Sequence, residues 1–217
     1  MLTSKFFRVS VFHIMRVSFL KIVLFSFLLS AGLQANESVN ETPWFPESIH
    51  LEMDFAGIKL KRSGTTTRTK YFFNIYKMAH YLDESCAVPS NKDELYEMIL
   101  MQNCTKQIST VYLREIKVEK IKASLLSDIK LNTNDDEYIK MLPHIDAFMS
   151  VIDQDVKEND EFVLRWHPDG TIVSEFQGKV ISTIKDENFA RTLWSIWFGQ
   201  FSVVKRDTLV QELITSS

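Results

Sequence analysis

Residues 58–82 of the chain read IKLKRSGTTTRTKYFFNIYKMAHYL and carry the clearest strand pattern in the sequence. The run alternates apolar and basic residues over 58–62, reaches the turn-forming residues 63–66 (Ser-Gly-Thr-Thr), and continues into a second run over 67–82 that is rich in aromatic and β-branched residues. The pattern predicts a β-hairpin with its turn at 63–66. Because both alternating faces of the second run are largely apolar, we expect a central strand that is covered on both sides.

The segments that follow predict an α+β domain with an antiparallel sheet. Helical spacing of apolar residues recurs in five segments: 91–101, 118–129, 134–151, 186–199 and 203–214. Strand-like composition recurs in four: 108–113, 162–166, 171–176 and 179–184. The turn signals Pro168-Asp169-Gly170 and Gln177-Gly178 join the last three strands into hairpins. We expect one such domain over residues 49–217.

The first 35 residues are typical of a secretory signal. Lys21 precedes an apolar run over 22–29, and small residues follow up to Ala35, after which we expect cleavage. Met15 is an alternative start, and an uncleaved N-terminal anchor is an alternative fate, although the apolar run is shorter than the ~20 residues a spanning helix needs. The sequence predicts a periplasmic or secreted protein with no stable membrane span after cleavage, and a polar leader over 36–48.

Two cysteines, Cys86 and Cys104, are the full complement of the chain. In an oxidising compartment two cysteines in one small domain favour a disulfide, and the alternative is two buried free thiols. If strands flank the helix between them, the bridge would clip that helix to the sheet edge.

Composition excludes several classes of function. Removing residues 1–35 leaves 21 of the 25 Lys and Arg residues against 28 Asp and Glu, which makes nucleic acid a poor partner. Glycine-rich phosphate loops, His-Glu-x-x-His, Gly-x-Ser-x-Gly and Cys-x-x-Cys motifs do not occur in the sequence. We therefore expect no metal and no cofactor.

An ordered set of segments resembles a known family. These are Gly64 with Arg68, then 74–82, 159–171, 177–178, and the helix 189–199 with its Phe-Ala and Ile-Trp-Phe-Gly motifs. Together they resemble the chalcone isomerase-like family, in particular its exported bacterial branch. The resemblance implies an open-faced β-sandwich, in which a curved antiparallel sheet is packed against helices and a ligand cleft lies between the two layers.

The resemblance also implies candidate site residues. Plant enzymes of the family hold a phenolate with an Arg and several hydroxyl groups, and non-catalytic relatives hold a fatty-acid carboxylate with an Arg and a Tyr. These positions match Arg68 and Tyr76, whereas two further hydroxyl positions fall near Val118 and Ile196, which argues against isomerase activity. On one straight strand Arg68 and Tyr76 would lie roughly 26 Å apart, so gripping one carboxylate would require a bend or a bulge.

The leading hypothesis is therefore an exported, non-catalytic protein that binds a small apolar or amphipathic ligand such as a fatty acid. The expected cleft walls come from the sheet and from the apolar helix: Phe72, Tyr76, Met78, Leu193, Trp194 and Trp197. One alternative is an isomerase that cyclises a chalcone-like substrate, with Arg68 stabilising a developing oxyanion. The other is a ligand-free scaffold for a partner protein whose nature is unknown.

Overall fold

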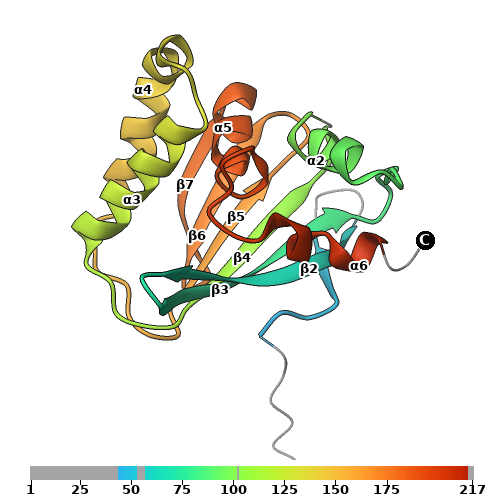
Figure 1. Ribbon diagram of the computed structural model, residues 1–217, viewed down its shortest axis with the longest axis horizontal. Coiled ribbons are helices and arrows are strands. Elements are labelled where there is room, and N and C mark those ends of the chain that lie inside the picture. Colours follow the sequence, from blue (N-terminus) through green and yellow to red (C-terminus); the bar gives the residue numbers. More distant parts are fainter. Residues whose placement is uncertain (1–43, 53–56, 102, 215–217) are drawn as a thin grey trace, which may run out of the picture. The chain divides into compact units, whose positions relative to one another are not determined.

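Seven antiparallel strands form one curved sheet, in which each strand pairs with its neighbours in the sequence (Figure 1). The computed structural model describes residues 44–52, 57–101 and 103–214. The strands are β1 Ser48–Leu51, β2 Ile58–Lys70, β3 Phe73–Asp83, β4 Lys106–Tyr112, β5 Glu161–Trp166, β6 Thr171–Phe176 and β7 Lys179–Lys185. The predicted signal peptide lies outside the described residues.

Helices pack together against one face of this sheet (Figure 1). The described helices are α2 Lys92–Met101, α3 Val118–Leu131, α4 Asp135–Ser150, α5 Glu187–Phe198, α6 Gln211–Ile214 and the short 3-10 helix η1 Arg206–Leu209. Helix α5 is the central one, and eight of its 12 residues are buried, as its apolar sequence predicts. The predicted α+β fold, a curved antiparallel sheet packed against helices, is confirmed. Among the described helices, none has the length and apolar character that crossing a bilayer demands.

The β2–β3 hairpin differs from the sequence prediction in the position of its turn. The chain reverses at Tyr71 and Phe72, and residues 63–66 lie inside β2. Ser63 is an extra residue at a break in the strand register, and its hydroxyl donates to the Leu209 carbonyl at 2.6 Å. A methyl group on Gly64 would come within 2.7 Å of the Leu209 carbonyl carbon. Ser63 and Gly64 thus serve close packing of the C-terminal segment on β2, which a local turn signal cannot distinguish from a hairpin turn.

Strand β3 is covered on both faces along its second half. On the helix side Met78 belongs to the main core, which α2, α4 and α5 complete. On the other side Ala79 and Tyr81 form a smaller buried cluster with Leu60, Val111 and Phe45. The expectation of a central, doubly covered strand is confirmed for this half, and the buried Phe45 shows that the end of the predicted leader packs on the sheet.

Helix ends follow the sequence signals except near the C-terminus. Asn134 and Glu137 form a reciprocal capping box at the start of α4, and Asp186 caps α5 through the backbone N–H of Phe189. The predicted continuous helix over 203–214 is wrong, because the segment divides into η1 and α6. In a continuous α-helix the Leu209 carbonyl would accept a hydrogen bond from the N–H of Leu213. Here that carbonyl accepts from the Ser63 hydroxyl, and the N–H of Leu213 donates to the Val210 carbonyl.

A disulfide joins Cys86, just after β3, to Cys104, just before β4, with their Cα atoms 6.3 Å apart. The bridge predicted from the sequence is therefore present. Because β3 and β4 are hydrogen-bonded neighbours in the middle of the sheet, the bridge closes the segment that contains α2 at the end of these two strands and not, as expected, at a sheet edge.

Candidate functional site

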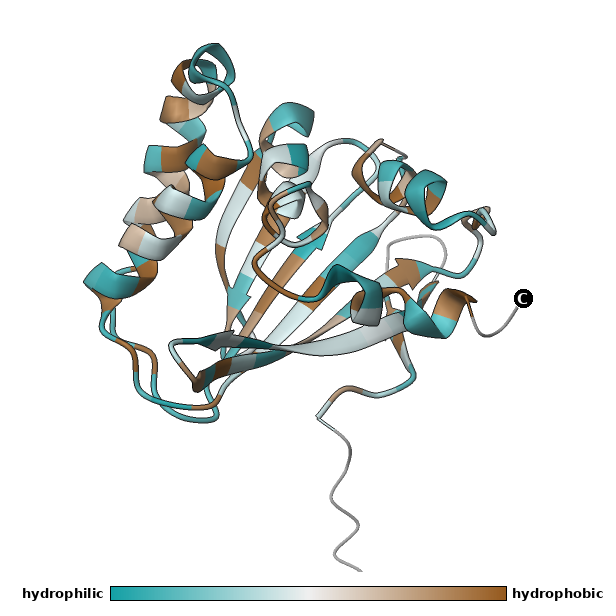
Figure 2. Ribbon diagram, in the orientation of Figure 1, coloured by the Kyte–Doolittle hydropathy of each residue, from teal (hydrophilic) through white to brown (hydrophobic). Residues whose placement is uncertain are grey.

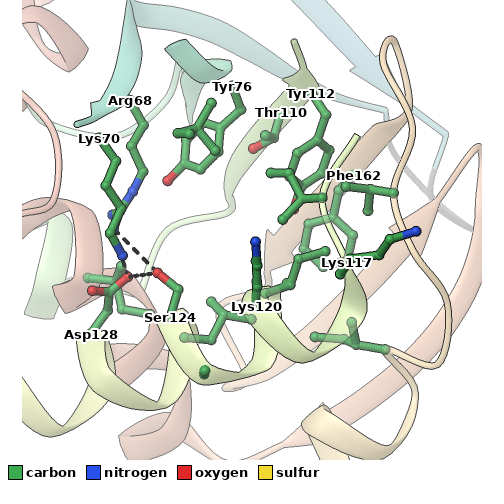
Figure 3. A pocket seen from close by; sticks show the side chains of 18 of the residues that line it. Arg68, Lys70, Tyr76, Thr110, Tyr112, Lys117, Lys120, Ser124, Asp128 and Phe162 are labelled. Atoms are coloured by element: carbon green, nitrogen blue, oxygen red, sulfur yellow. Dashed lines mark hydrogen bonds and ion pairs between the residues drawn. The ribbon is translucent and has the colours of Figure 1, made fainter. Parts of the chain in front are cut away.

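A cavity of about 760 Å³ lies between the sheet and α3, α5 and the end of α4. Its apolar walls include Phe162 and Leu164 from β5, Leu193 and Trp197 from α5, and Phe148 from α4. Its volume lies within the range of small-molecule sites, which are typically apolar with a few placed polar groups. Most of the labelled polar groups in Figure 3 come from β2, β3, β4 and α3.

Arg68 and Tyr76 meet across two strands rather than along one. Because the hairpin turns at 71–72, Arg68 of β2 pairs directly with Tyr76 of β3. Directly paired residues in an antiparallel sheet have Cβ atoms about 5 Å apart, so the separation of roughly 26 Å along a straight strand does not apply. The Tyr76 hydroxyl points toward the Arg68 side chain (Figure 3).

The Arg68 guanidinium already has an anionic partner within the cavity. Its Nη2 lies 3.3 Å from Oδ2 of Asp128, and the exposed fractions of the two side chains are 10% and 15%. Ser124, one turn earlier on α3, accepts a 3.5 Å hydrogen bond from the same Nη2 and donates to Asp128 (Figure 3). Burial raises the pKa of the Asp128 carboxyl, and the nearby Arg68 opposes that rise. The ion pair neutralises Arg68, and Lys70, which lines the cavity beside it (Figure 3), gives this end of the cavity a net positive charge.

Two tyrosines extend the polar surface along the sheet. The Tyr76 oxygen accepts a 3.0 Å hydrogen bond from Nε1 of Trp197, and burial raises the pKa of its phenol. The Tyr112 ring packs edge-on against Tyr76 with ring centroids 5.9 Å apart, and burial raises its phenol pKa as well. Lys120, from α3, extends into the cavity toward Tyr112 and Thr110 (Figure 3).

The structure brings together four of the seven predicted site residues. Arg68, Tyr76, Leu193 and Trp197 all line the cavity. Leu193 and Trp197 are four residues apart, so they share one face of α5.

The other three residues were expected to form cavity walls, but they do not line the cavity. Phe72 is at the hairpin turn with its side chain fully exposed, whereas Met78 and Trp194 are wholly buried in the core. Trp194 lies about 100° around the helix from Leu193, where its Nε1 donates to Nε2 of His80 at 3.5 Å. His80 is thus a buried, hydrogen-bonded core residue, and burial lowers its pKa to about 3.

Several residues that line the cavity were not predicted as site residues from the sequence. The main ones are Asp128, Ser124, Tyr112 and Lys120. Ser124 and Asp128 share one face of α3 by their i, i+4 spacing, and Thr110 and Tyr112 share one face of β4 by alternation. These periodicities identify the faces but not the partner across the cavity. The described residues contain no group of three or more His, Cys, Asp or Glu side chains that could hold a metal ion.

Comparisons with known proteins agree with this fold. The chain is similar over 79% of its length, and over 93% of the other chain, to the crystal structure of a fatty-acid binding protein from Arabidopsis thaliana, with a TM-score of 0.65 at 12% identity. No curated protein sequence matches. The model of the family described as chalcone isomerase-like matches residues 46–212. The chain therefore belongs to the chalcone isomerase-like family.

Proposed function

We propose that this protein binds a fatty acid or a similar amphipathic molecule without transforming it. The observation that carries the proposal is a buried cation, Arg68, beside the Tyr76 hydroxyl at one side of a largely apolar cavity of about 760 Å³. A carboxylate suits the planar fork of guanidinium N–H donors, and an acyl chain suits the walls of Phe162, Leu164 and Leu193. The structural similarity to a fatty-acid binding protein supports the same ligand class.

The hydrogen bonds at Tyr76 leave it able to donate. Its oxygen accepts from Nε1 of Trp197, so its own O–H is available for a ligand oxygen. A ligand carboxylate would then receive one bond from Tyr76 and one or two from the N–H groups of Arg68. The Asp128 carboxylate competes for the same guanidinium, so it weakens the attraction of Arg68 for any anion in the cavity, whether a ligand carboxylate or a developing oxyanion.

We further propose that the protein acts after export, in the periplasm or outside the cell. The Cys86–Cys104 disulfide supports this, because such bonds persist in oxidising compartments. Mass spectrometry of the chain recovered from expressing cells tests it: a mature N-terminus at Asn36 is expected, and a chain retained in the cytoplasm with both thiols reduced would contradict it.

Native mass spectrometry after gentle purification, followed by titration with a fatty-acid series, tests ligand binding. Each added methylene should tighten binding about fourfold, from about 0.8 kcal/mol per buried CH₂, until the cavity is full. Arg68→Met should weaken carboxylate binding, whereas Lys61→Met, an exposed cation on the same strand outside the cavity lining, should not.

Three results would oppose the proposal. These are recovery of an empty protein that no fatty acid stabilises against heat, equal affinities across the chain-length series, and an Arg68-dependent acceleration of chalcone cyclisation. The last would favour the isomerase.

A further inference from the structure

The tip of the β2–β3 hairpin exposes three consecutive aromatic side chains. Tyr71 is 80% exposed, Phe72 102% and Phe73 58%. Figure 2 shows hydrophobic colouring where the two strands meet. Single exposed apolar residues are ordinary, but contiguous exposed rings mark a surface that contacts something apolar.

The backbone at the tip holds these rings outward in an unusual conformation. Tyr71 and Phe72 have φ values of 49° and 68°, in the left-handed region that bulky residues rarely adopt. Two-residue hairpin turns of this kind normally use Asn-Gly or Asp-Gly. Bulky aromatic residues in this position raise the conformational energy of the turn, and such positions are concentrated at functional sites. The placement of two aromatic rings here therefore indicates a role beyond making the turn.

Two cations accompany the rings. Nζ of Lys70 lies 6.0 Å from the Tyr71 ring centroid, and the Arg114 guanidinium lies 4.6 Å from the Phe73 ring centroid. Within the described residues neither cation has a carboxylate within ion-pair distance. Apolar rings beside Lys and Arg are the composition of a membrane-interface anchor, in which rings enter the boundary of the acyl chains and cations contact lipid phosphates.

The tip also borders the cavity. Tyr71 and Phe73 belong to its lining together with the exposed Lys70, Arg114 and Lys120, so these residues form part of its open side, to which the exposed Glu115, Lys117 and Asp153 also contribute. We propose that the hairpin tip docks on a phospholipid bilayer, with the open side of the cavity against the lipid surface, so that an acyl ligand passes between bilayer and cavity. Ligand transfer rests on the proposed function, whereas docking does not.

Flotation with lipid vesicles tests the docking, using the chain purified from cells that express the whole sequence. Vesicles contain either phosphatidylcholine alone or phosphatidylcholine and phosphatidylglycerol in equal amounts. The Phe72→Ser variant should weaken vesicle binding about tenfold or more, as expected for withdrawal of one Phe side chain from an apolar phase. The Arg114→Gln variant should weaken binding to the anionic vesicles about fivefold. Phe201→Ser, at an exposed phenylalanine outside the cavity lining, is the matched control and should change binding less than about twofold.

The proposal is overturned if the wild-type chain floats with neither vesicle, or if Phe72→Ser binds vesicles as tightly as the wild type. It is also overturned if Phe201→Ser weakens vesicle binding as much as Phe72→Ser does. Thermal stabilisation by a free fatty acid separates docking from ligand binding. Phe72 lies outside the cavity lining, so a fatty acid should still stabilise Phe72→Ser against heat although this variant binds vesicles weakly. Vesicle binding without any fatty-acid stabilisation would support docking and oppose the proposed function.

Discussion

Replacing Asp128 by Asn removes the negative charge that faces Arg68 inside the cavity. The two side chains are at most 15% exposed, and their charged atoms lie 3.3 Å apart. A buried cation that loses its partner keeps its desolvation cost, so we expect the free energy of unfolding to fall by about 3 kcal/mol. For a chain of this size, that loss lowers the melting temperature by roughly 6–12 °C.

The same substitution should strengthen the binding of carboxylate ligands. A carboxylate on the other side of the Arg68 guanidinium would lie about 6 Å from Asp128, where two like charges repel by roughly 3 kcal/mol at an effective dielectric constant of about 20. Removing this repulsion tightens binding up to about 100-fold. A fatty alcohol of the same length carries no charge, so its affinity should change little.

Calorimetric titration with the acid and the alcohol measures both effects. Glu119→Gln, which removes an exposed carboxylate on the same helix outside the cavity lining, is the control. Because burial raises the Asp128 pKa, a fall in pH neutralises this carboxyl, and wild-type affinity for a still-ionised ligand should rise as pH falls. Asp128→Asn should lack that rise. Unchanged or weaker carboxylate binding by Asp128→Asn would refute the placement of the ligand's charge at Arg68.

Three further predictions concern stability. Burial lowers the pKa of Lys106 to about 7, below 10.5 in the unfolded chain, so the free energy of unfolding should rise with pH by up to about 1.4 kcal/mol per unit between pH 7 and 9.5. Urea titrations of Lys106→Met should lose this slope, and a slope equal to wild type would contradict the assignment. Gly64→Ala should destabilise the fold by about 3 kcal/mol through contact with the Leu209 backbone, whereas Gly178→Ala, with nothing near its Cβ position but a φ of 72°, should lose only about 1 kcal/mol. Reducing the Cys86–Cys104 bridge should lower the free energy of unfolding by about 3 kcal/mol. Urea denaturation with and without reductant measures this loss, and equal denaturation midpoints would show that the bridge does not stabilise the fold.

Local chemistry in the sequence was enough to predict most elements and their order. Alternation and turn residues identified the strands from 108 to 184, and Asn134 and Asp186 marked the starts of α4 and α5. These signals succeed because capping, turn geometry and apolar periodicity involve residues within about four positions of one another. The curvature of the sheet was predicted from the family resemblance, and the disulfide was predicted from the two cysteines in one small domain.

The position of the hairpin turn and the surroundings of Arg68 depend on tertiary packing. Ser63 and Gly64 carry the composition of a turn, yet packing against Leu209 keeps them inside β2 and moves the reversal to Tyr71 and Phe72. That shift places Arg68 opposite Tyr76, and the packing of α3 brings Asp128 to the guanidinium from 60 positions away in the chain. Contacts at such separations depend on how whole elements pack. A sequence pattern shows which face of a helix or strand a residue lies on, but not which residue of another element it contacts.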